Sequence, residues 1–320
     1  MSRHHRPGPL LAALAATLAV ALALAACGKG TTRPNPPAAA PSATSSFPMT
    51  VTDDDGVTMS LKRAPTRIVT FAPANTEILF ALGLGERIVG VSGTFDDHPP
   101  AAKRIVHVGG ATGVQPNLEK VVSLHPDLLL ATSGGEDWKK RLRGLGVPVF
   151  SINATSLPDV FHDIDTVGTI TGVPAKAEAL TRSLSRRAGT IEQRVSADPA
   201  VTCFYEVYFQ PPVFTVGPGS FVFDLLKRAG CDPVTSTLHR QYPELSVEAL
   251  IQDDPRVYLV DSLSASSPAA VARRPGFDAL SAVRHHRVVV IPSDLVTRPG
   301  PRIVLGLRAL AAALHPGAFP

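Results

Sequence analysis

The sequence is poor in cysteine, tryptophan and charge. It has three cysteines and one tryptophan among 320 residues, and only 18% of the residues are charged. It contains no GxSxG nucleophile elbow, no HExxH zinc motif and no GxxxxGK[ST] phosphate-binding loop. Its ten histidines lack the paired spacing that is typical of metal ligands. We therefore expect neither an enzyme nor a metal-binding protein, and no catalytic cofactor.

The charge balance also argues against a nucleic-acid partner. The formal net charge is only +4, and the basic residues are scattered rather than gathered in a stripe. Apolar residues make up 44% of the chain, which is enough to bury substantial cores. A chain of this length can hold two domains of ordinary size.

Residues 1–27 resemble the signal sequence of a bacterial lipoprotein. A basic start precedes an apolar run from Leu10 to Ala26, and small residues lead to Cys27. Cleavage of such a signal leaves Cys27 as the lipidated first residue. The alternative is an uncleaved anchor helix, because 17 apolar residues lie at the lower limit for spanning a bilayer. In both cases we expect an extracytoplasmic protein held at the cell membrane.

An alternation of short apolar strands and helices predicts an α/β fold with two lobes. Residues 28–47 are rich in proline, alanine, serine and threonine, which indicates a flexible tether. Residues 48–156 and 200–320 each show the alternation that builds a mainly parallel sheet. Residues 157–199 lie between them as a helical connector. We expect one long helix to join the lobes and a ligand cleft to lie between them.

Single elements are predicted from periodicity and capping residues. The segment from Pro174 to Ser196 is expected to form a helix of roughly 35 Å, with one apolar face. The residues of that face are Leu180, Leu184, Ala188, Ile191 and Val195. The stretch PANTEILFALGLG predicts a helix capped by Asn75 or Thr76. DDDG predicts a hairpin turn near the start of the first lobe, and RRPGFDALSAV predicts a helix in the second.

Two segments of the chain repeat the same pattern. NLEKVVSLHPDLLLA begins at Asn117, and SVEALIQDDPRVYLV begins at Ser246. Both place a glutamate two residues after a capping residue, at Glu119 and Glu248. The simplest interpretation of each glutamate is that it complements the helix dipole. The matching offset further predicts equivalent elements in the two lobes.

Two cysteines remain in the second lobe. Cys203 opens an apolar strand, and Cys231 follows the helix that returns after it. A returning helix brings its end near the start of the strand, so a disulfide is geometrically feasible outside the cytoplasm. Two buried free thiols are the alternative.

Five segments beyond about Phe47 resemble a known family. They read RIVTFAPANTEILFALGLGERIVGVS, HPPAAKRIVHVGG, NLEKVVSLHPDLLLA, PPVFTVGPGSF and PRIVLGLRAL. Together they resemble the class III extracytoplasmic substrate-binding proteins of ABC importers, which carry cobalamin, ferric siderophores or haem. Within that family they are most similar to the vitamin B12-binding branch. The resemblance implies a monomer that delivers its ligand to an ABC permease and its ATPase. A receptor-associated sensor is the alternative role.

The resemblance also implies roles for particular residues. Glu119 and Glu248 match the carboxylates that dock onto permease arginines in this family. The ligand cleft is expected on loops that follow strand ends. The candidate cleft residues are Ala74, Asn75, Thr94, Phe95, Gly110, Gly113, Trp138, Phe209, Phe214, Tyr242, Asp294 and Arg298. For each aromatic residue among them, ordinary packing within a lobe is the alternative.

The ligand is expected to be cobalamin or a related corrinoid. The loop VGGATGVQP lacks the aromatic ring that B12-binding relatives commonly carry there, but its glycines leave room for a bulky ligand. A ferric siderophore or haem is the alternative. Anionic siderophores favour several convergent arginines or lysines, and the cleft loops offer only Arg240 and Arg298. This difference favours the corrinoid.

Overall fold

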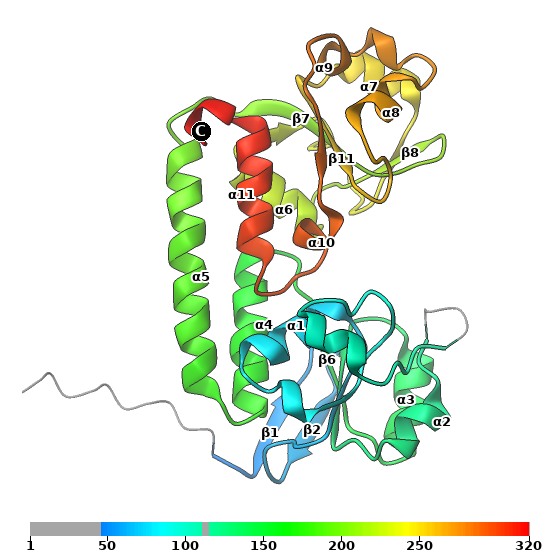
Figure 1. The fold of residues 1–320 in the computed structure, drawn as a ribbon, viewed down its shortest axis with the longest axis vertical. Helices are drawn as coiled ribbons and strands as arrows, with labels where there is room; N and C mark the ends of the chain where they lie inside the picture. The colour runs from blue at the N-terminus through cyan, green and yellow to red at the C-terminus, as the bar shows by residue number, and fades with distance from the viewer. Residues whose placement is uncertain (1–45, 111–114, 320) are drawn as a thin grey trace, which may run out of the picture. The chain divides into compact units, whose positions relative to one another are not determined.

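The computed structural model describes residues 46–110 and 115–319 (Figure 1). The signal segment with Cys27, the tether up to residue 45 and Gly113 lie outside the described residues. The described chain forms two lobes that contact each other within one compact unit. None of the helices in this part of the chain is long and apolar enough to cross a membrane.

The first lobe is built on a parallel sheet with the strand order β4-β3-β5-β6. Its strands are β3 (Ile68–Thr70), β4 (Ile88–Gly90), β5 (Leu128–Thr132) and β6 (Val149–Ile152). Its helices are α1 (Pro73–Ala81), α2 (Leu118–Ser123) and α3 (Glu136–Gly144), with 3₁₀ turns at Gly85–Arg87 and Pro100–Arg104. Nearly all residues of β3, β5 and β6 are buried. This pattern is typical of a parallel sheet covered on both faces.

The predicted hairpin is present at the start of the first lobe. Strands β1 (Met49–Thr52) and β2 (Thr58–Leu61) pair antiparallel around the DDDG turn. The Asp53 carboxylate accepts hydrogen bonds from the backbone amides of Asp55 and Val57, at 3.1 and 2.7 Å. Lys139 of α3 is fully buried, and its Nζ lies 2.5 Å from the Asp55 carboxylate. The hairpin is therefore fastened to the lobe by a buried ion pair.

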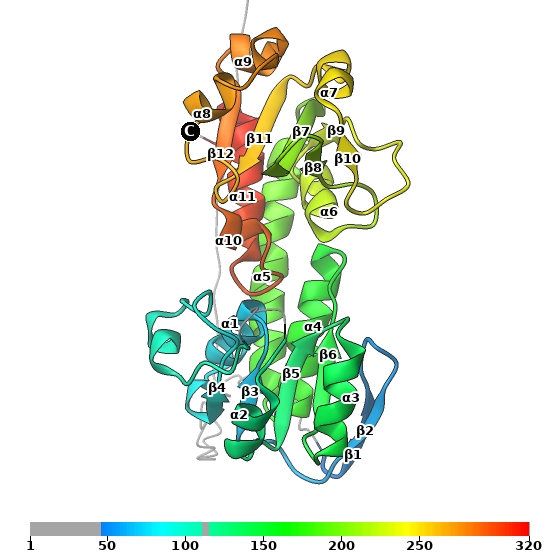
Figure 2. The same cartoon turned by 90° about the vertical axis from the view of Figure 1, so that its right-hand side faces the viewer.

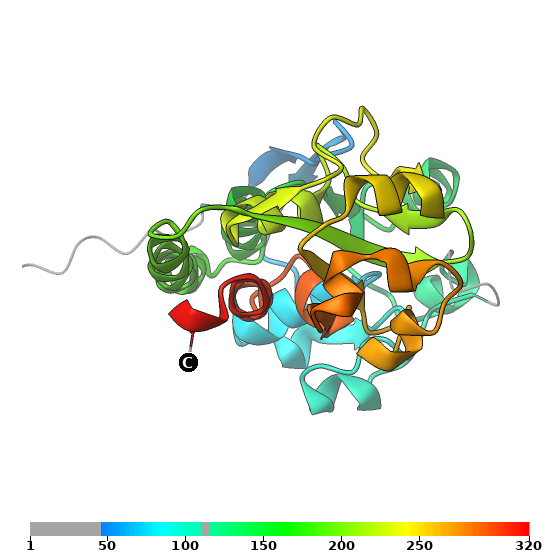
Figure 3. The same ribbon diagram turned by 90° about the horizontal axis from the view of Figure 1, so that it is seen from above.

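The connector consists of two antiparallel helices, α4 (Leu157–Ile170) and α5 (Pro174–Val195). The predicted apolar face of α5 is confirmed for Leu184, Ala188, Ile191 and Val195, which are buried, while Leu180 is only partly buried. Gly168 allows the two helices to approach closely, since a Cβ atom there would lie 2.2 Å from the Ala177 Cβ. At its far end α5 packs beside α11 (Ile303–Leu314), as Figures 1 and 3 show. A single helix thus runs along both lobes.

The second lobe is built on a mixed sheet with the order β10-β8-β7-β11-β12, and β9 pairs with β7. Its strands are β7 (Val201–Phe209), β8 (Val213–Thr215), β9 (Cys231–Pro233), β10 (Glu244–Leu245), β11 (Val257–Asp261) and β12 (Val288–Ile291). Its helices besides α11 are α6 (Phe221–Arg228), α7 (Val247–Asp253), α8 (Pro268–Ala272), α9 (Ser281–Arg284) and α10 (Ser293–Val296), with 3₁₀ turns at Phe277–Ala279 and Pro316–Ala318. The pairings of β7 with β11 and of β11 with β12 are parallel, as predicted. Strand β9 also pairs parallel with β7, but no strand was predicted there. The antiparallel strands β8 and β10 were not predicted.

Two helix predictions were wrong in detail. Helix α1 begins at Pro73 after the extended residue Ala72, so Asn75 and Thr76 lie inside the helix and do not cap it. Proline suits the first helical position because its missing amide has no partner there anyway. The stretch RRPGFDALSAV does not form a single helix: it follows the end of α8 at Ala272 and holds a 3₁₀ turn and then most of α9. Pro275 has no amide to donate, and Gly276 adopts a left-handed conformation with φ of 80°.

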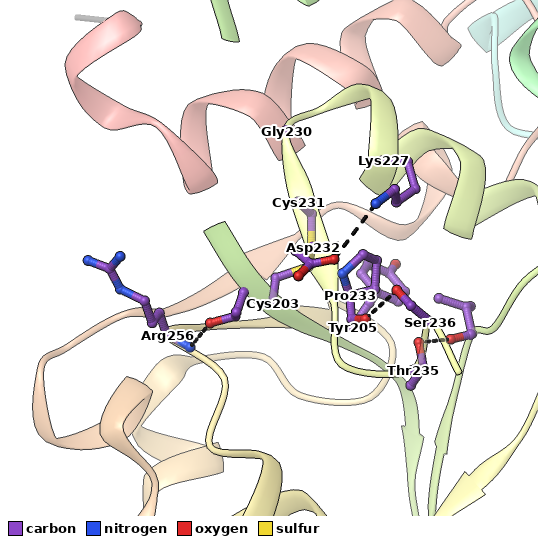
Figure 4. The surroundings of a disulfide bond; sticks show 12 residues. Cys203, Tyr205, Lys227, Gly230, Cys231, Asp232, Pro233, Thr235, Ser236 and Arg256 are labelled. Atoms are coloured by element: carbon purple, nitrogen blue, oxygen red, sulfur yellow. Dashed lines mark hydrogen bonds and ion pairs between the residues drawn. A yellow bond between two sulfur atoms is a disulfide. The ribbon is translucent and has the colours of Figure 1, made fainter. Parts of the chain in front are cut away.

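The two remaining cysteines form a disulfide (Figure 4). Cys203 lies in β7 and Cys231 in β9, which are neighbouring parallel strands. Their Cα atoms are 5.8 Å apart, within the usual range for a disulfide. Cys231 thus belongs to a short strand after α6, and the bond links that strand to the sheet.

Candidate functional site

A hollow of about 520 Å³ lies between the lobes. Its walls combine apolar, hydroxyl and charged side chains. The lining residues are Pro73, Phe95 and Asp97 from the first lobe, and Ser262, Leu263, Ser293, Asp294, Thr297 and Arg298 from the second. They follow the carboxyl ends of strands β3, β4, β11 and β12. Ligands of α/β proteins usually bind at this edge of a parallel sheet, so the hollow is the candidate ligand cleft.

Ion pairs join the two lobes beside the cleft, between α1 and the start of α11. The Glu77 carboxylate accepts hydrogen bonds from Nε and Nη2 of Arg302, at 2.8 and 2.7 Å. Its Oε1 also lies 3.2 Å from Nη1 of Arg298. Glu77 belongs to the first lobe and both arginines to the second. A paired fork of this kind is a strong, directional contact, so the network joins the lobes at the cleft.

The same arginines contact two further carboxylates. Arg298 Nη1 lies 2.9 Å from the Asp97 carboxylate, and Arg302 Nη1 lies 2.7 Å from that of Asp294. Burial alone would raise the pKa of Asp97, but the hydrogen bond and charge of Arg298 outweigh it and lower that pKa. The hydrogen bond with Glu77 and contacts with Asp294 raise the pKa of Arg302, although burial opposes them. Both arginines are therefore paired with carboxylates.

A hydrogen-bonded aspartate fixes the loop that carries Phe95 and Asp97. Asp96 is buried, and its carboxylate accepts from the Thr76 hydroxyl at 2.5 Å and from the Gly93 amide at 2.9 Å. The Ser92 hydroxyl donates to it as well. With Asp96 held inward, the side chain of Phe95 is left 65% exposed at the cleft.

Four predicted cleft residues of the first lobe do not line the hollow. Ala74 is buried beneath Gly300, and Asn75 is buried in α1. The side-chain amide of Asn75 has no hydrogen-bond partner among the described residues. Thr94 is exposed next to Phe95 but does not line the hollow. Gly110 donates its amide to the Gln115 carbonyl at 2.7 Å, and a Cβ there would clash with that oxygen.

The predicted aromatic residues divide between packing and exposure. Trp138 is 6% exposed and packs edge-on against Phe71, so it belongs to the first-lobe core. Phe209 contacts the edge of Phe277, with their ring centroids 5.5 Å apart. Phe214 and Tyr242 are exposed on β8 and on the loop before β10, and neither lines the hollow. Of the predicted aromatics, only Phe95 lines it.

A buried glutamate supports the second-lobe wall. Glu206 of β7 is fully buried and pairs with Arg274, whose Nη2 lies 2.9 Å from Glu206 Oε1. The hydroxyls of Tyr258 and Ser264 also donate to this carboxylate. Ser264 belongs to the loop after β11 that presents Ser262 and Leu263 to the cleft. The network therefore positions that loop.

The sequence analysis did not identify Glu77, Arg302 or Glu206 as residues that support the cleft. Glu77 lies within PANTEILFALGLG, and nothing in that stretch indicates a distant partner. A glutamate within the apolar strand VTCFYEVY did carry a signal, because a buried charge requires a partner. The partner, Arg274, lies 68 residues further along the chain. For Glu77 the separation from Arg302 is 225 residues.

The two glutamates of the repeated pattern lie at equivalent places. The Asn117 side chain caps α2 by accepting from the Lys120 amide at 2.9 Å, and Ser246 caps α7 by accepting from the Ala249 amide at 3.1 Å. Glu119 and Glu248 are exposed in the first turns that follow. Hydrogen bonds from its own backbone amide and from Ser246 lower the pKa of Glu248. Figures 1 and 2 show α2 and α7 on the side of the molecule away from α5.

A resident metal centre finds no support in the described ranges. Across residues 46–110 and 115–319, no group of three or more histidine, cysteine, aspartate or glutamate side chains is arranged to hold a metal ion. The cleft therefore offers apolar surface, hydroxyls and paired charges to a ligand.

Comparisons with known proteins agree with this architecture. An uncharacterized ABC transporter substrate-binding lipoprotein, YvrC, of Bacillus subtilis (strain 168) is 34% identical over 319 residues, covering 95% of this chain and 97% of the relative. A cobalamin-binding protein of Halobacterium salinarum is 32% identical over 300 residues, covering 89% of this chain and 80% of the relative. The crystal structure of a candidate iron-binding (periplasmic solute-binding) protein from Staphylococcus epidermidis superposes with a TM-score of 0.70 at 27% identity, covering 79% of this chain and 100% of that chain.

The family assignment follows from a match over most of the chain. Residues 68–295 match the family described as periplasmic binding protein. This range holds the sheets of both lobes and every residue that lines the cleft except Thr297 and Arg298. The chain belongs to the periplasmic binding protein family.

Proposed function

We propose that this protein is the lipid-anchored, extracytoplasmic solute-binding component of an ABC importer. It captures cobalamin or a related corrinoid between its lobes and delivers it to the permease. The observation that carries this proposal is the similarity to the cobalamin-binding protein of Halobacterium salinarum, which extends over 89% of the chain. The corrinoid is cargo and takes part in no reaction on the protein.

The chemistry of the cleft suits a large, flat ligand with amide groups at its edge. Phe95 and Leu263, from opposite lobes, are 65% and 74% exposed and line the hollow. Their apolar surfaces can cover a macrocycle, as is usual in ligand sites. The hydroxyls of Ser262, Ser293 and Thr297 can exchange hydrogen bonds with amide side groups.

Helix α5 and the ion pairs of Glu77 limit the motion of the lobes. A continuous helix of 22 residues has no hinge of its own, and two arginines of the second lobe contact Glu77 of the first. We therefore expect the ligand to be accommodated by loop and side-chain adjustment rather than by wide closure.

Glu119 and Glu248 are proposed to seat the loaded protein on arginines of the permease. Three observations support this role. Both side chains are exposed, both follow a capped helix N-terminus at the same offset, and neither forms an ion pair with another described residue. Complementary charges of this kind orient docking and raise the association rate.

Membrane attachment is proposed through a lipidated Cys27. The Bacillus subtilis relative is named as a lipoprotein, and its match covers 95% of this chain. The segment between Cys27 and the first described residue, Ser46, would link the anchor to the lobes. We expect the protein to act as a monomer that moves between ligand capture and the permease.

A ferric siderophore or haem is the second candidate cargo. The Staphylococcus epidermidis structure is of a candidate iron-binding protein, and it shares the fold at 27% identity. Gel filtration can separate the candidates. The full chain in detergent is mixed with cyanocobalamin, ferric siderophores of several charges or haem, and the visible spectrum of the protein peak is recorded.

A corrinoid spectrum that co-elutes with the protein is the expected result. Iron charge-transfer or haem absorbance without a corrinoid would reassign the cargo within the family. A protein peak without any chromophore, from a preparation with a folded circular-dichroism spectrum, would contradict the proposed function.

A further inference from the structure

The charge balance of the cleft is set by five side chains. Glu77, Asp97 and Asp294 supply three carboxylates, and they contact the two guanidinium groups of Arg298 and Arg302. The cluster therefore keeps one negative charge in excess. The lining of the hollow repeats this balance, because it contains two aspartates and one arginine.

An arginine of the cluster can bind a ligand only by giving up contacts with its carboxylate partners. Arg298 and Arg302 have side chains that are only 13% and 18% exposed, and Glu77 is 3% exposed between them. If an anion drew Arg298 away, the Glu77 and Asp97 carboxylates would lose a partner. The loss of a partner is unfavourable for the buried Glu77 carboxylate, and the half-exposed Asp97 carboxylate would compete with the anion for Arg298. The present pairing therefore opposes the approach of an anion.

Other charges near the cleft do not reverse this balance. Asp96, beside Asp97, adds a further carboxylate, which is satisfied by hydrogen bonds inside its own loop. Lys103 is close enough to lower the pKa of Asp97, but it is exposed and does not line the hollow. Arg240 is exposed on the loop before β10 and is absent from the lining.

We propose that the cleft selects its ligand by charge, accepting uncharged or cationic macrocycles and metal complexes and excluding anionic ones. Asp97 is the residue that sets this selectivity, because it pairs with the arginine that lines the hollow. This inference rests on the proposed function, since it concerns the cargo of the same cleft.

Asp97 is also the member of the cluster that can be changed without disturbing the core. Its side chain is 45% exposed, whereas that of Glu77 is 3% exposed. Asp97→Asn would leave the Glu77 contacts in place and remove one of the two carboxylates that hold Arg298. The guanidinium would then be available to an anion in the hollow.

Two pairs of probes test the inference, using the full chain in detergent. The first pair has one corrin ring with different side groups: dicyanocobinamide carries amides, and dicyanocobyrinic acid carries carboxylates. The second pair is ferrichrome, an uncharged ferric tris-hydroxamate, and ferric enterobactin, an anionic ferric tris-catecholate. Dissociation constants are measured by quenching of tryptophan and tyrosine fluorescence. The readout is the affinity ratio within a pair, compared between variants.

The wild-type protein is expected to bind the uncharged member of at least one pair more tightly. Asp97→Asn should shift the ratio toward the anionic member by about tenfold, the effect of one charge-assisted hydrogen bond. Asp97→Glu should restore the wild-type preference. Asp232→Asn is the matched control, because Asp232 forms an exposed ion pair with Lys227, its side chain is 58% exposed, and it does not line the hollow.

Binding without preference for the uncharged member, or an unchanged ratio in Asp97→Asn, would overturn the inference while leaving the proposed function intact. Failure of all four probes to bind would overturn the proposed function, and the inference with it. The two failures are therefore distinguishable in one set of titrations.

Discussion

The two lobes share a βα plan but use buried charge for different purposes. In the first lobe a fully buried cation, Lys139, binds Asp55, the Thr132 carbonyl and the Ser151 hydroxyl. It fastens the β1-β2 hairpin. In the second lobe the buried ion is an anion, Glu206, which binds Arg274 and holds the loop after β11. The Lys139 pair therefore supports a hairpin at the edge of the first lobe, whereas the Glu206 pair supports a loop of the candidate cleft.

The sheets differ in the same sense. The first-lobe sheet is wholly parallel, while the second-lobe sheet adds the antiparallel strands β8 and β10 and a disulfide between β7 and β9. Strand β7, which carries Glu206, pairs with β8, β9 and β11. The lobe with the buried anion therefore has the more heavily braced central strand.

The largest effect is expected from breaking the buried pair of the second lobe. Glu206→Ala leaves the Arg274 guanidinium, which is 10% exposed, without its carboxylate. We expect the free energy of unfolding to fall by about 3–5 kcal/mol, because an uncompensated buried charge is costly. Urea denaturation measures the loss. Glu244→Ala, an exposed glutamate on β10 of the same sheet, is the control, and an equal loss there would refute the explanation.

Removal of the disulfide should cost slightly less. The Cys203→Ser and Cys231→Ser double variant opens a link between residues that are 28 apart in sequence. The entropy of the unfolded chain then rises, and we expect a loss of about 3 kcal/mol. The same urea titration, run on the wild type with and without reductant, checks the value. A stability that is independent of the bond would show that the pairing of β7 with β9 alone suffices.

A buried carboxylate of the connector offers a pH test. Burial, together with the charges of Asp54 and Asp159, raises the pKa of Asp163 to about 7. Its folded-state pKa lies above the unfolded value, so the folded state binds the proton more tightly and this contribution to stability is lost as pH rises toward 7. Between pH 5 and pH 7 the contribution should fall by about 2 kcal/mol.

Asp163→Asn isolates that contribution, because the amide does not titrate. The stability of the variant should vary less between pH 5 and pH 7 than that of the wild type. Parallel pH profiles for the two proteins would assign the change to another group. Asp137→Asn, an exposed aspartate of helix α3, is the matched control.

The smallest effect on stability is expected for the two glutamates that occupy equivalent positions in the two lobes. Glu119→Ala with Glu248→Ala removes two exposed side chains without ion pairs to the described residues, so unfolding should change by less than about 0.5 kcal/mol. Ligand affinity should be unchanged, and uptake into cells that carry the cognate permease should be lost. Normal uptake would leave both residues with a helix-dipole role only.

Local features of the chain were well predicted, for a physical reason. The apolar face of α5 and the hairpin around DDDG depend on periodicity and turn chemistry within a few residues. The caps at Asn117 and Ser246 are local as well, since each side chain bonds an amide three residues ahead. The misplaced cap of α1 is the informative failure, because Pro73 offered a start signal as clear as that of Asn75.

The aromatic candidates show where local reasoning ended. Trp138 and Phe95 both lie on loops or helix starts after strands, yet one is 6% exposed and the other 65%. Gly135 closes over the Trp138 indole, where a Cβ would lie 2.1 Å from its nitrogen. No property of the segment SGGEDW distinguishes a ring that folds inward from one that faces a ligand.

The sequence by itself determined the two lobes, most strands of their parallel pairings and the equivalent positions of Glu119 and Glu248, because these depend on patterns that extend over a few turns. Only the tertiary structure decided which charges meet at the cleft. Glu77 reaches Arg298 across 221 residues, and Asp97 reaches it across 201. Pairings at such distances depend on how two lobes pack around α5, and packing between lobes leaves no periodic trace in the chain.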